Sequence, residues 1–167
     1  MTSLTTAHNA PALATVATGV PEPTGTVAAP QSEDARLVLR QPGGAFERFV
    51  DGGWWPHSLE LTAELPALIS AAEAAGFGSV RRVSYHLTGW NPAPRRAAML
   101  GRVIKLSGYR TQPAAAISLV DGSGWDHVDI VVIPPDTDPD VARRALEMAG
   151  DDDDQHRAAE ILELAAG

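Results

Sequence analysis

The chain of 167 residues contains no cysteine. This absence excludes disulfides, thiol nucleophiles, iron–sulfur clusters and thiolate zinc sites, and it favours the cytoplasm. The sequence also lacks any apolar run that approaches the roughly 18 residues of a membrane-spanning helix. Basic residues are scarce, because 13 Lys and Arg against 21 Asp and Glu give a net charge of −8. Since this acidic balance repels phosphate groups, we expect neither nucleic acid nor an anionic membrane as a partner.

The first 34 residues contain no Lys, no Arg and no aromatic residue. Such a composition, rich in Ala, Thr and Pro, buries too little apolar surface to offset the entropy of ordering the chain. It also lacks the basic start and apolar run of a signal peptide. We therefore predict a disordered leader over residues 1–34, a single domain over residues 35–150 and an acidic amphipathic C-terminal helix in residues 151–167.

The main domain shows the patterns of short strands and a few helices. Alternating apolar and polar residues, or clusters of β-branched residues, predict strands over 36–40, 46–51, 80–87, 96–99, 102–107, 115–120 and 126–133. Their short connections favour antiparallel pairing, because parallel neighbours need long crossovers. We expect an α+β fold with a mainly antiparallel sheet, or an incomplete barrel, of about six to seven strands with two to three helices.

The first helix is predicted over residues 62–75. Pro66 is tolerated only near the start of a helix, which favours Thr62 over Ser58 as the N-cap. Gly76 is expected to end the helix, because glycine readily adopts the left-handed conformation found there.

Two further helices are predicted near the C-terminus. Asp138 and Pro139 have the residue types of an N-cap and a first helical position, and this helix should end near Gly150. The last helix, over residues 155–166, is too short to be stable alone, so its apolar stripe must dock on this domain or on another chain. The stripe consists of Ala158, Ile161, Leu162 and Ala165.

Two turns organise the strands. The Asp-Gly-Ser-Gly sequence at 121–124 is a strong turn signal, and Leu100 with Gly101 is a weaker one. Gly101 adopts a positive φ at little cost, but Leu100 does not. A two-residue hairpin at this point places Arg96 directly opposite Lys105.

That register suggests a binding site. Directly opposed like charges are unfavourable unless an anion or water lies between them. Extending the register brings the loops of Trp90 and Arg110 to one end of the hairpin, where Trp90 would offer a stacking surface. The candidate ligand-binding residues are Trp90, Arg95, Arg96, Lys105 and Arg110. In the alternative interpretation, the arginines pair with the acidic C-terminal segment or with Asp51.

Four segments carry distinctive motifs: DGGWWP at 51–56, VSYHLTGWNPAPRR at 83–96, GYRTQP at 108–113 and VIPPDTD at 132–138. Together they resemble a family of small actinobacterial proteins classified as a domain of unknown function. The resemblance covers residues 36–146 and implies no activity. Leu100 and His57 depart from the expected pattern, which has an acidic residue before the hairpin glycine and a larger basic residue in place of His57. Twelve Arg against one Lys is typical of a GC-rich genome.

Common catalytic motifs are absent from the sequence. The spacing of four acidic residues is similar to that of a calcium-binding loop: Asp136, Asp138, Asp140 and Glu147. However, Val141 stands where that loop requires glycine. Helix capping explains these acids better. The sequence thus implies neither a metal nor a cofactor, and it argues against an enzyme.

Secondary candidates for ligand binding are Trp55, His57, His127 and Asp129. His127 and Asp129 are two residues apart on one predicted strand and therefore share a face, and His86 lies on another strand. These residues suit either a metal or acid–base site or ordinary surface hydrogen bonding. Trp54 and Trp55 should point to opposite sides of the chain, so that one fills the core and the other lies near the surface.

Three functions are consistent with the sequence. The preferred one is a non-catalytic binding or regulatory module whose partner is a protein or a second copy of the chain. The alternative is a binder of, or an enzyme acting on, a small anionic metabolite through the Arg and Trp cluster. The third, nucleic-acid binding, is disfavoured by the acidity of the chain, which is concentrated in residues 136–167 with ten acidic and three basic side chains.

Overall fold

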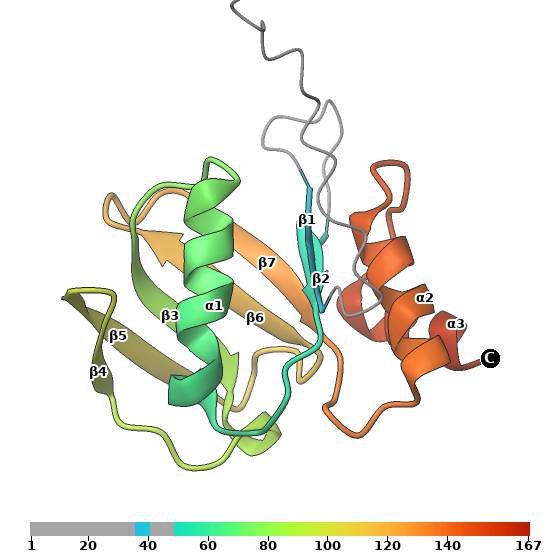
Figure 1. Ribbon diagram of the computed structural model, residues 1–167, viewed down its shortest axis with the longest axis horizontal. Helices are drawn as coiled ribbons and strands as arrows, with labels where there is room; N and C mark the ends of the chain where they lie inside the picture. The colour runs from blue at the N-terminus through green and yellow to red at the C-terminus, as the bar shows by residue number, and fades with distance from the viewer. Residues whose placement is uncertain (1–35, 41–48) are drawn as a thin grey trace, which may run out of the picture. The chain divides into compact units, whose positions relative to one another are not determined.

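The computed structural model of the protein describes residues 36–40 and 49–167, so the predicted leader lies outside the described residues (Figure 1). The described residues form seven strands, three α-helices and one short 3-10 helix. In chain order these are β1 (Leu37–Leu39), β2 (Gly52–Trp54), α1 (Leu61–Ala74), β3 (Val80–His86), η1 (Leu87–Gly89), β4 (Arg96–Met99), β5 (Arg102–Tyr109), β6 (Ala116–Asp121), β7 (His127–Val132), α2 (Pro139–Gly150) and α3 (Ala158–Ala166).

The strands form one mixed sheet in the order β1-β2-β7-β6-β3-β5-β4. The predicted α+β class with a mostly antiparallel sheet is confirmed. The expectation that short connections enforce antiparallel pairing is wrong for two pairs, β2 with β7 and β3 with β5. After β3 the chain passes to the edge of the sheet and returns as β4, and β5 then fills the place between β4 and β3. A short hairpin thereby produces a parallel neighbour.

The strand predicted over residues 46–51 is wrong in the part that the structure describes. Residues 46–48 lie outside the described part, residues 49–51 are not in a strand, and β2 begins at Gly52. Gly52 and Gly53 are buried where neighbouring elements approach closely. A Cβ atom at Gly52 would collide with the carbonyl oxygen of Val38, and one at Gly53 would lie 2.8 Å from the Cβ of Ala149. The two glycines therefore serve close packing and not a turn.

Helix α1 begins one residue before the predicted N-cap, so the assignment of Thr62 to that position is wrong. The N-cap is Glu60, whose carbonyl oxygen accepts hydrogen bonds from Ala63 and Glu64. The helix extends to Leu61 because this side chain is fully buried with the rest of the apolar stripe. The predicted end is confirmed.

At the end of α1, Gly76 has a φ of +99°. Its N–H donates to the carbonyl oxygen of Glu73, and the N–H of Phe77 donates to that of Ala72. These two bonds form a Schellman motif, which satisfies carbonyl groups that the helix leaves unpaired.

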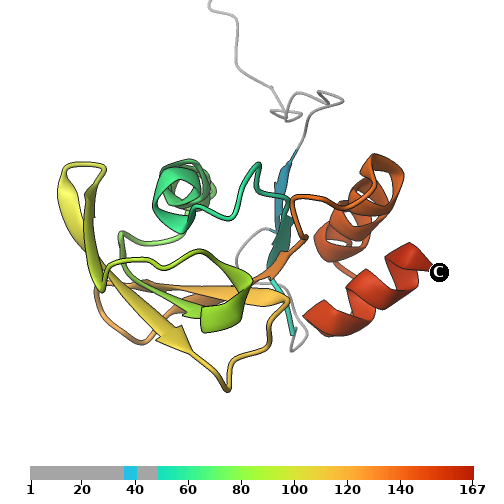
Figure 2. The same cartoon turned by 90° about the horizontal axis from the view of Figure 1, so that it is seen from below.

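Two apolar clusters lie on the two faces of the sheet. α1 packs on one face, which includes Ile117 and Ile130, whereas α2 and α3 pack on the opposite face against Val131 and Ile133. In Figure 2, α1 (green) lies on one side of the sheet and α2 and α3 (orange to red) gather beside β1 and β2. Among the described helices, none combines the length and apolar character needed to cross a lipid bilayer.

Helix α2 begins as predicted, because the Asp138 carboxylate accepts a hydrogen bond from the N–H of Asp140 at 2.9 Å. Helix α3 begins at Ala158, three residues after the predicted start. The preceding residues form a turn in which the Asp154 carboxylate accepts from the backbone N–H of His156 at 2.7 Å and contacts its ring Nδ1 at 2.8 Å. The predicted stripe of α3 docks on this domain, with Ile161 fully buried.

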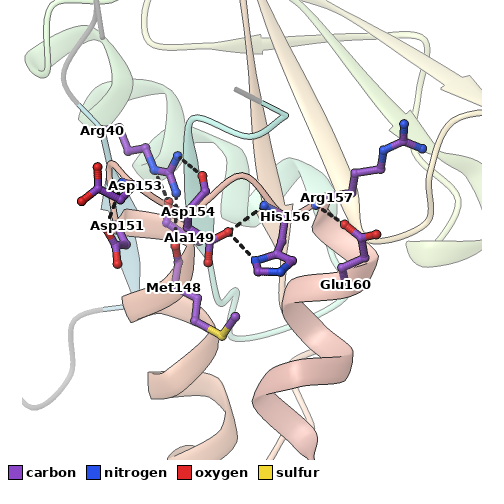
Figure 3. A network of polar contacts seen from close by, with 9 residues as sticks. All are labelled: Arg40, Met148, Ala149, Asp151, Asp153, Asp154, His156, Arg157 and Glu160. Atoms are coloured by element: carbon purple, nitrogen blue, oxygen red, sulfur yellow. Dashed lines mark hydrogen bonds and ion pairs between the residues drawn. The ribbon is translucent and has the colours of Figure 1, made fainter. Parts of the chain in front are cut away.

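A buried arginine that directly follows β1 contacts the end of α2 and the turn before α3 (Figure 3). Arg40 is 6% exposed, and its guanidinium donates to the carbonyl oxygens of Ala149 at 2.8 Å, Met148 at 3.1 Å and Asp154 at 3.1 Å. The first two carbonyls end α2, where a positive charge also complements the helix dipole. Arg40 thus caps α2 and holds the turn that leads to α3.

Candidate functional site

One face of the sheet carries α1, and the helices within the described residues cover only part of the opposite face. α2 contacts β1 and β2, and α3 contacts β7, so these helices occupy the end of that face nearest β1 (Figure 2). Side chains alternate along β3: Val83 is buried in the core beneath α1, whereas Arg82 is exposed on the other side. We call the part of this second face formed by β4, β5, β3 and the adjoining half of β6 the uncovered face.

Three exposed basic side chains lie side by side on the uncovered face. Arg96 on β4 is opposite Lys105 on β5, as the hairpin predicts, and Lys105 is opposite Arg82 on β3. Neighbouring strands are about 4.8 Å apart, so these residues span about 10 Å across the sheet. We call the three residues the cationic row. The same line continues through Val120 on β6 to His127 on β7.

The charges of the cationic row are not neutralised within the described part of the chain. Among residues 36–40 and 49–167, the structure shows no ion pair to Arg82, Arg96 or Lys105. The alternative pairing with Asp51 is not formed among these residues; the Asp51 carboxylate instead accepts the N–H of Asp129 at 2.9 Å. Three like charges at adjacent register positions repel one another, and a bound anion would relieve that repulsion.

A polar row lies next to the cationic row. Its members occupy matching positions on four neighbouring strands: Ser107 on β5, Ser84 on β3, Ser118 on β6 and Asp129 on β7. The hydroxyl of Ser118 donates to the Asp129 carboxylate, whose other oxygen lies 3.8 Å from Nε2 of His127. His127 and Asp129 therefore share a face.

His86 lies elsewhere, with its Nε2 at 3.2 Å from the carbonyl oxygen of Arg110. Within the described residues, no group of three His, Asp or Glu side chains is placed to hold a metal ion.

A small notch adjoins the cationic row. It has a volume of about 240 Å³ and is lined by Arg81, Arg82, Lys105, Val120 and the turn at 121–124. The carboxylate in this notch is already engaged. The Ser123 hydroxyl donates to Asp121 at 2.7 Å, and with the backbone N–H groups of Ser123 and Gly124 it keeps the pKa of Asp121 below the ordinary value of 3.8. The notch thus contains the cations Arg81, Arg82 and Lys105 together with the Asp121 carboxylate, which is already hydrogen-bonded within the turn.

Two of the remaining predicted cluster residues, Trp90 and Arg110, lie away from the cationic row. Trp90 is 8% exposed and stacks on Trp54 in the core beneath α1, with ring centroids 5.3 Å apart. The β4–β5 ladder ends at Arg96 and Lys105, and beyond it β5 pairs with β3. Arg110 therefore lies about 16 Å from Lys105 along the chain, at about 3.3 Å per residue. Arg95 is exposed beside the row and uses its carbonyl oxygen to accept from Leu106.

The double-Trp motif divides between core and surface as predicted. Trp54 is 4% exposed, whereas Trp55 is partly buried and stacks under the guanidinium of Arg36 at 4.1 Å. The indole N–H of Trp55 donates to the carbonyl oxygen of Pro134 at 3.1 Å. His57 is exposed, and its Nδ1 lies 3.5 Å from a carboxylate oxygen of Glu64. Trp55 and His57 thus stabilise the segment that leads into α1.

A second cavity lies apart from the cationic row, and the two share no residue. It has a volume of about 420 Å³ and is walled mainly by apolar side chains from five separate segments. We call it the Trp90 pocket. Its lining comprises Pro56, Leu59, Thr88, Gly89, Trp90, Ala114, Ala115, Val132, Pro134, Pro135, Asp136 and Leu162.

Sequence reasoning missed Arg82 as a site residue. The pattern Val-Arg-Arg-Val at 80–83 lies in a predicted strand, but regular alternation would turn only one of the two arginines away from the core. The structure exposes both, with a register shift between Val80 and Arg82. The register of Arg82 against Lys105 depends on the parallel pairing of β3 with β5, which no local pattern encodes. The Trp90 pocket was equally hidden, since its walls come from segments far apart in the chain.

Comparison with known proteins identifies a family and no activity. Residues 36–149 match DUF5994, a family of unknown function. Neither the curated proteins nor the solved structures compared with the chain contain a match. The family match covers more than half of the chain and includes all three residues of the cationic row. The chain therefore belongs to the DUF5994 family.

Proposed function

We propose that this DUF5994 protein is a non-catalytic binding module that docks an acidic segment of a partner protein on its uncovered face. The observation that carries this proposal is the cationic row, in which Arg96, Lys105 and Arg82 adjoin one another without a carboxylate partner in the described residues. The cysteine-free composition favours the cytoplasm as the compartment in which this binding takes place.

The geometry of the cationic row suits an extended acidic segment. The row spans about 10 Å, and carboxylates on alternate residues of an extended chain are about 7 Å apart, so two of them can contact three cations. Each charge-assisted hydrogen bond contributes about 1.5 to 3 kcal/mol when it is partly shielded from water. The row can therefore supply both affinity and orientation.

The surroundings of the cationic row favour a protein as the partner. Val103 is 58% exposed on the uncovered face, beside Lys105 on the same strand. Trp125 follows the turn that lines the notch, and its side chain is 88% exposed. Trp and Arg are both enriched at protein interfaces, so an exposed Trp and an exposed aliphatic side chain beside these arginines favour a protein partner. Nucleic acid remains disfavoured, because the whole chain carries a net charge of −8.

The notch supports a second candidate, a small anionic metabolite. Its volume of about 240 Å³ accommodates one phosphate or carboxylate group between Arg82 and Lys105. This ligand would use two residues of the cationic row and would not require Val103 or Trp125. The two candidates therefore differ in which substitutions weaken binding.

A titration with a labelled acidic peptide tests the proposal on the full chain. A short peptide of alternating Asp and Ser should bind, and the same peptide with Asn in place of Asp should not. Binding should weaken as salt is added, because exposed charges are screened. Lys105→Gln removes the centre of the row and should weaken binding about tenfold.

Arg110→Gln is the matched control, since Arg110 is exposed and lies outside the cationic row. It should leave the affinity for the Asp peptide unchanged. Equal binding of the Asp and Asn peptides would refute the proposal. If Arg110→Gln lowered the affinity for the Asp peptide as much as Lys105→Gln does, the binding site would instead lie at the loops of Trp90 and Arg110. If tripolyphosphate binds in a Lys105-dependent manner and the Asp peptide does not, the small-anion candidate is correct.

A further inference from the structure

We propose that the Trp90 pocket binds a small molecule that combines an apolar ring with one basic group. This site goes beyond the proposed function, because its lining contains no residue of the cationic row. The volume of about 420 Å³ lies within the usual range of ligand pockets, roughly 300 to 1,000 Å³.

The apolar walls of the pocket are fixed before any ligand arrives. Trp90 is held by its stack on Trp54, and the Pro134 wall is held by the indole N–H of Trp55 at 3.1 Å. The backbone N–H of Asn91 donates to the carbonyl oxygen of Leu59 at 3.0 Å, which ties a third wall to the Trp90 loop. Prolines further limit the motion of the lining. A pocket that is already ordered binds a rigid ring without an entropic cost of closing loops.

The charge of the pocket determines the charge that its ligand should have. Asp136 is the charged residue of the lining, it is exposed, and no ion pair to it occurs within the described ranges. It stands at the start of residues 136–167, which have ten acidic and three basic side chains. An anionic ligand would be repelled there, whereas an ammonium group on the ring could pair with the Asp136 carboxylate.

The hydroxyl-bearing side chain of the lining, Thr88, is already engaged. The hydroxyl of Thr88 lies 2.9 Å from the Nδ1 atom of His86, so it is hydrogen-bonded within the protein. Asp136 is therefore the group that selects the ligand. The predicted ligand class is an aromatic or alicyclic amine.

Two probes with the same ring and opposite charge test this inference on the full chain. Phenethylamine should shift the backbone amide resonances of Ala114, Ala115, Asp136 and Leu162 in a two-dimensional NMR titration. 3-Phenylpropionate should bind at least about tenfold more weakly, because one charge-assisted contact is replaced by repulsion.

Asp136→Asn should abolish the preference for the amine, and Asp126→Asn, an exposed control in the β6–β7 turn, should retain it. Ala114→Phe fills the pocket from an exposed position and should prevent binding of both probes. Equal affinity for the two probes, shifts centred outside the lining, or no binding of phenethylamine would each overturn the inference. None of these outcomes affects the peptide titration, which reports on the cationic row.

Discussion

At the scale of single residues, Leu100 stands out by its backbone conformation. It has a φ of +52° in the two-residue turn between β4 and β5, and the following Gly101 has a φ of +72°. This pair of values is typical of a type I′ hairpin turn, whose first position favours Asn, Asp or Gly. The sequence predicts that a leucine adopts this conformation only at a cost. The structure places Leu100 there because the β4–β5 register requires the turn.

Replacing Leu100 by Asn should therefore stabilise the protein. The left-handed conformation costs an ordinary residue about 1 to 2 kcal/mol, and Asn adopts it more readily. We expect Leu100→Asn to raise the free energy of unfolding in urea by about 1 kcal/mol. Leu100→Val, a β-branched control, should lower it. If Asn were also destabilising, the exposed Leu100 side chain would have to stabilise the hairpin through contacts of its own.

Glu64 illustrates how a single carboxylate can order a loop. Burial raises its pKa, but hydrogen bonds from the His57 backbone N–H at 3.1 Å and the Ser58 hydroxyl at 2.8 Å, with the nearby His57 ring, outweigh burial. The pKa of Glu64 is consequently below its ordinary value of 4.5. The associated stability is present above that value and is lost as the pH falls through the lower pKa of the folded state.

Ser58→Ala should raise the pKa of Glu64 in the folded protein, since it removes a donor to the carboxylate. The carbon-13 NMR resonance of the Glu64 carboxyl group measures this shift directly. The stability difference between the two proteins should be largest near neutral pH and should shrink in acid, where Glu64 is protonated. Ser70→Ala, an exposed control on α1, should leave the pKa of Glu64 unchanged.

At the scale of elements, α3 depends on the domain against which it packs. Ile161 is fully buried against α2 and the sheet, whereas Leu164 on the same helix is 53% exposed. Ile161→Asp should lower the free energy of unfolding by about 3 kcal/mol or more, because it buries an unpaired charge or detaches the helix. Leu164→Asp should change it by less than about 0.5 kcal/mol. Similar effects of the two substitutions in a urea melt would contradict this docking.

The elements that the sequence predicts well are those with local signals. Strands β3 to β7 and helix α2 follow from alternation, turn residues and the Asp138–Pro139 start. The register of Arg96 with Lys105 follows from a two-residue turn. β2 was missed because its glycines resemble a turn, and they are explained only by the approach of β1 and α2. The start of α1 was missed because burial of Leu61 outweighs the preference for Thr at an N-cap.

The candidate site is predictable only in part, because only some of its residues are brought together by a local signal. The pair of Arg96 and Lys105 comes from a local hairpin, but Arg82 joins it through a parallel pairing between non-consecutive strands. The predicted association with Trp90 and Arg110 assumes that the β4–β5 ladder continues, whereas the described ladder ends at Arg96. Long-range pairing decides which side chains meet, and a single sequence does not reveal it.

At the scale of the whole molecule, Arg40 connects the sheet to the C-terminal helices. It lies just after β1 and contacts three carbonyl groups from α2 and the turn that precedes α3 (Figure 3). Arg40→Met keeps much of the side-chain volume but removes the donor to the carbonyl groups of Ala149 and Asp154, whereas that of Met148 still accepts from the N–H of Asp151 at 3.2 Å. We expect it to lower the free energy of unfolding by about 3 kcal/mol.

Arg40→Lys tests whether the forked shape of the guanidinium matters. A single ammonium group cannot reach three carbonyl groups in this arrangement as a guanidinium does, so Lys should restore only part of the loss. Arg81→Met, at an exposed position, serves as the control for a change of net charge. Full recovery with Lys in urea unfolding would show that charge near the end of α2 matters more than the hydrogen-bond geometry.

The parallel pairing of β2 with β7 has a consequence for the order of folding. It joins Gly52 to Ile130, whereas β4–β5 and β6–β7 are closed by short turns. Because distant segments meet slowly, we expect the two hairpins to form first and the β1–β2 segment to dock last. Until then the edge of β7 is an open template for strand pairing. In a concentrated solution of refolding molecules, β1 and β2 of one copy can therefore complete the sheet of another, which makes strand exchange at this edge the expected route to misassembly.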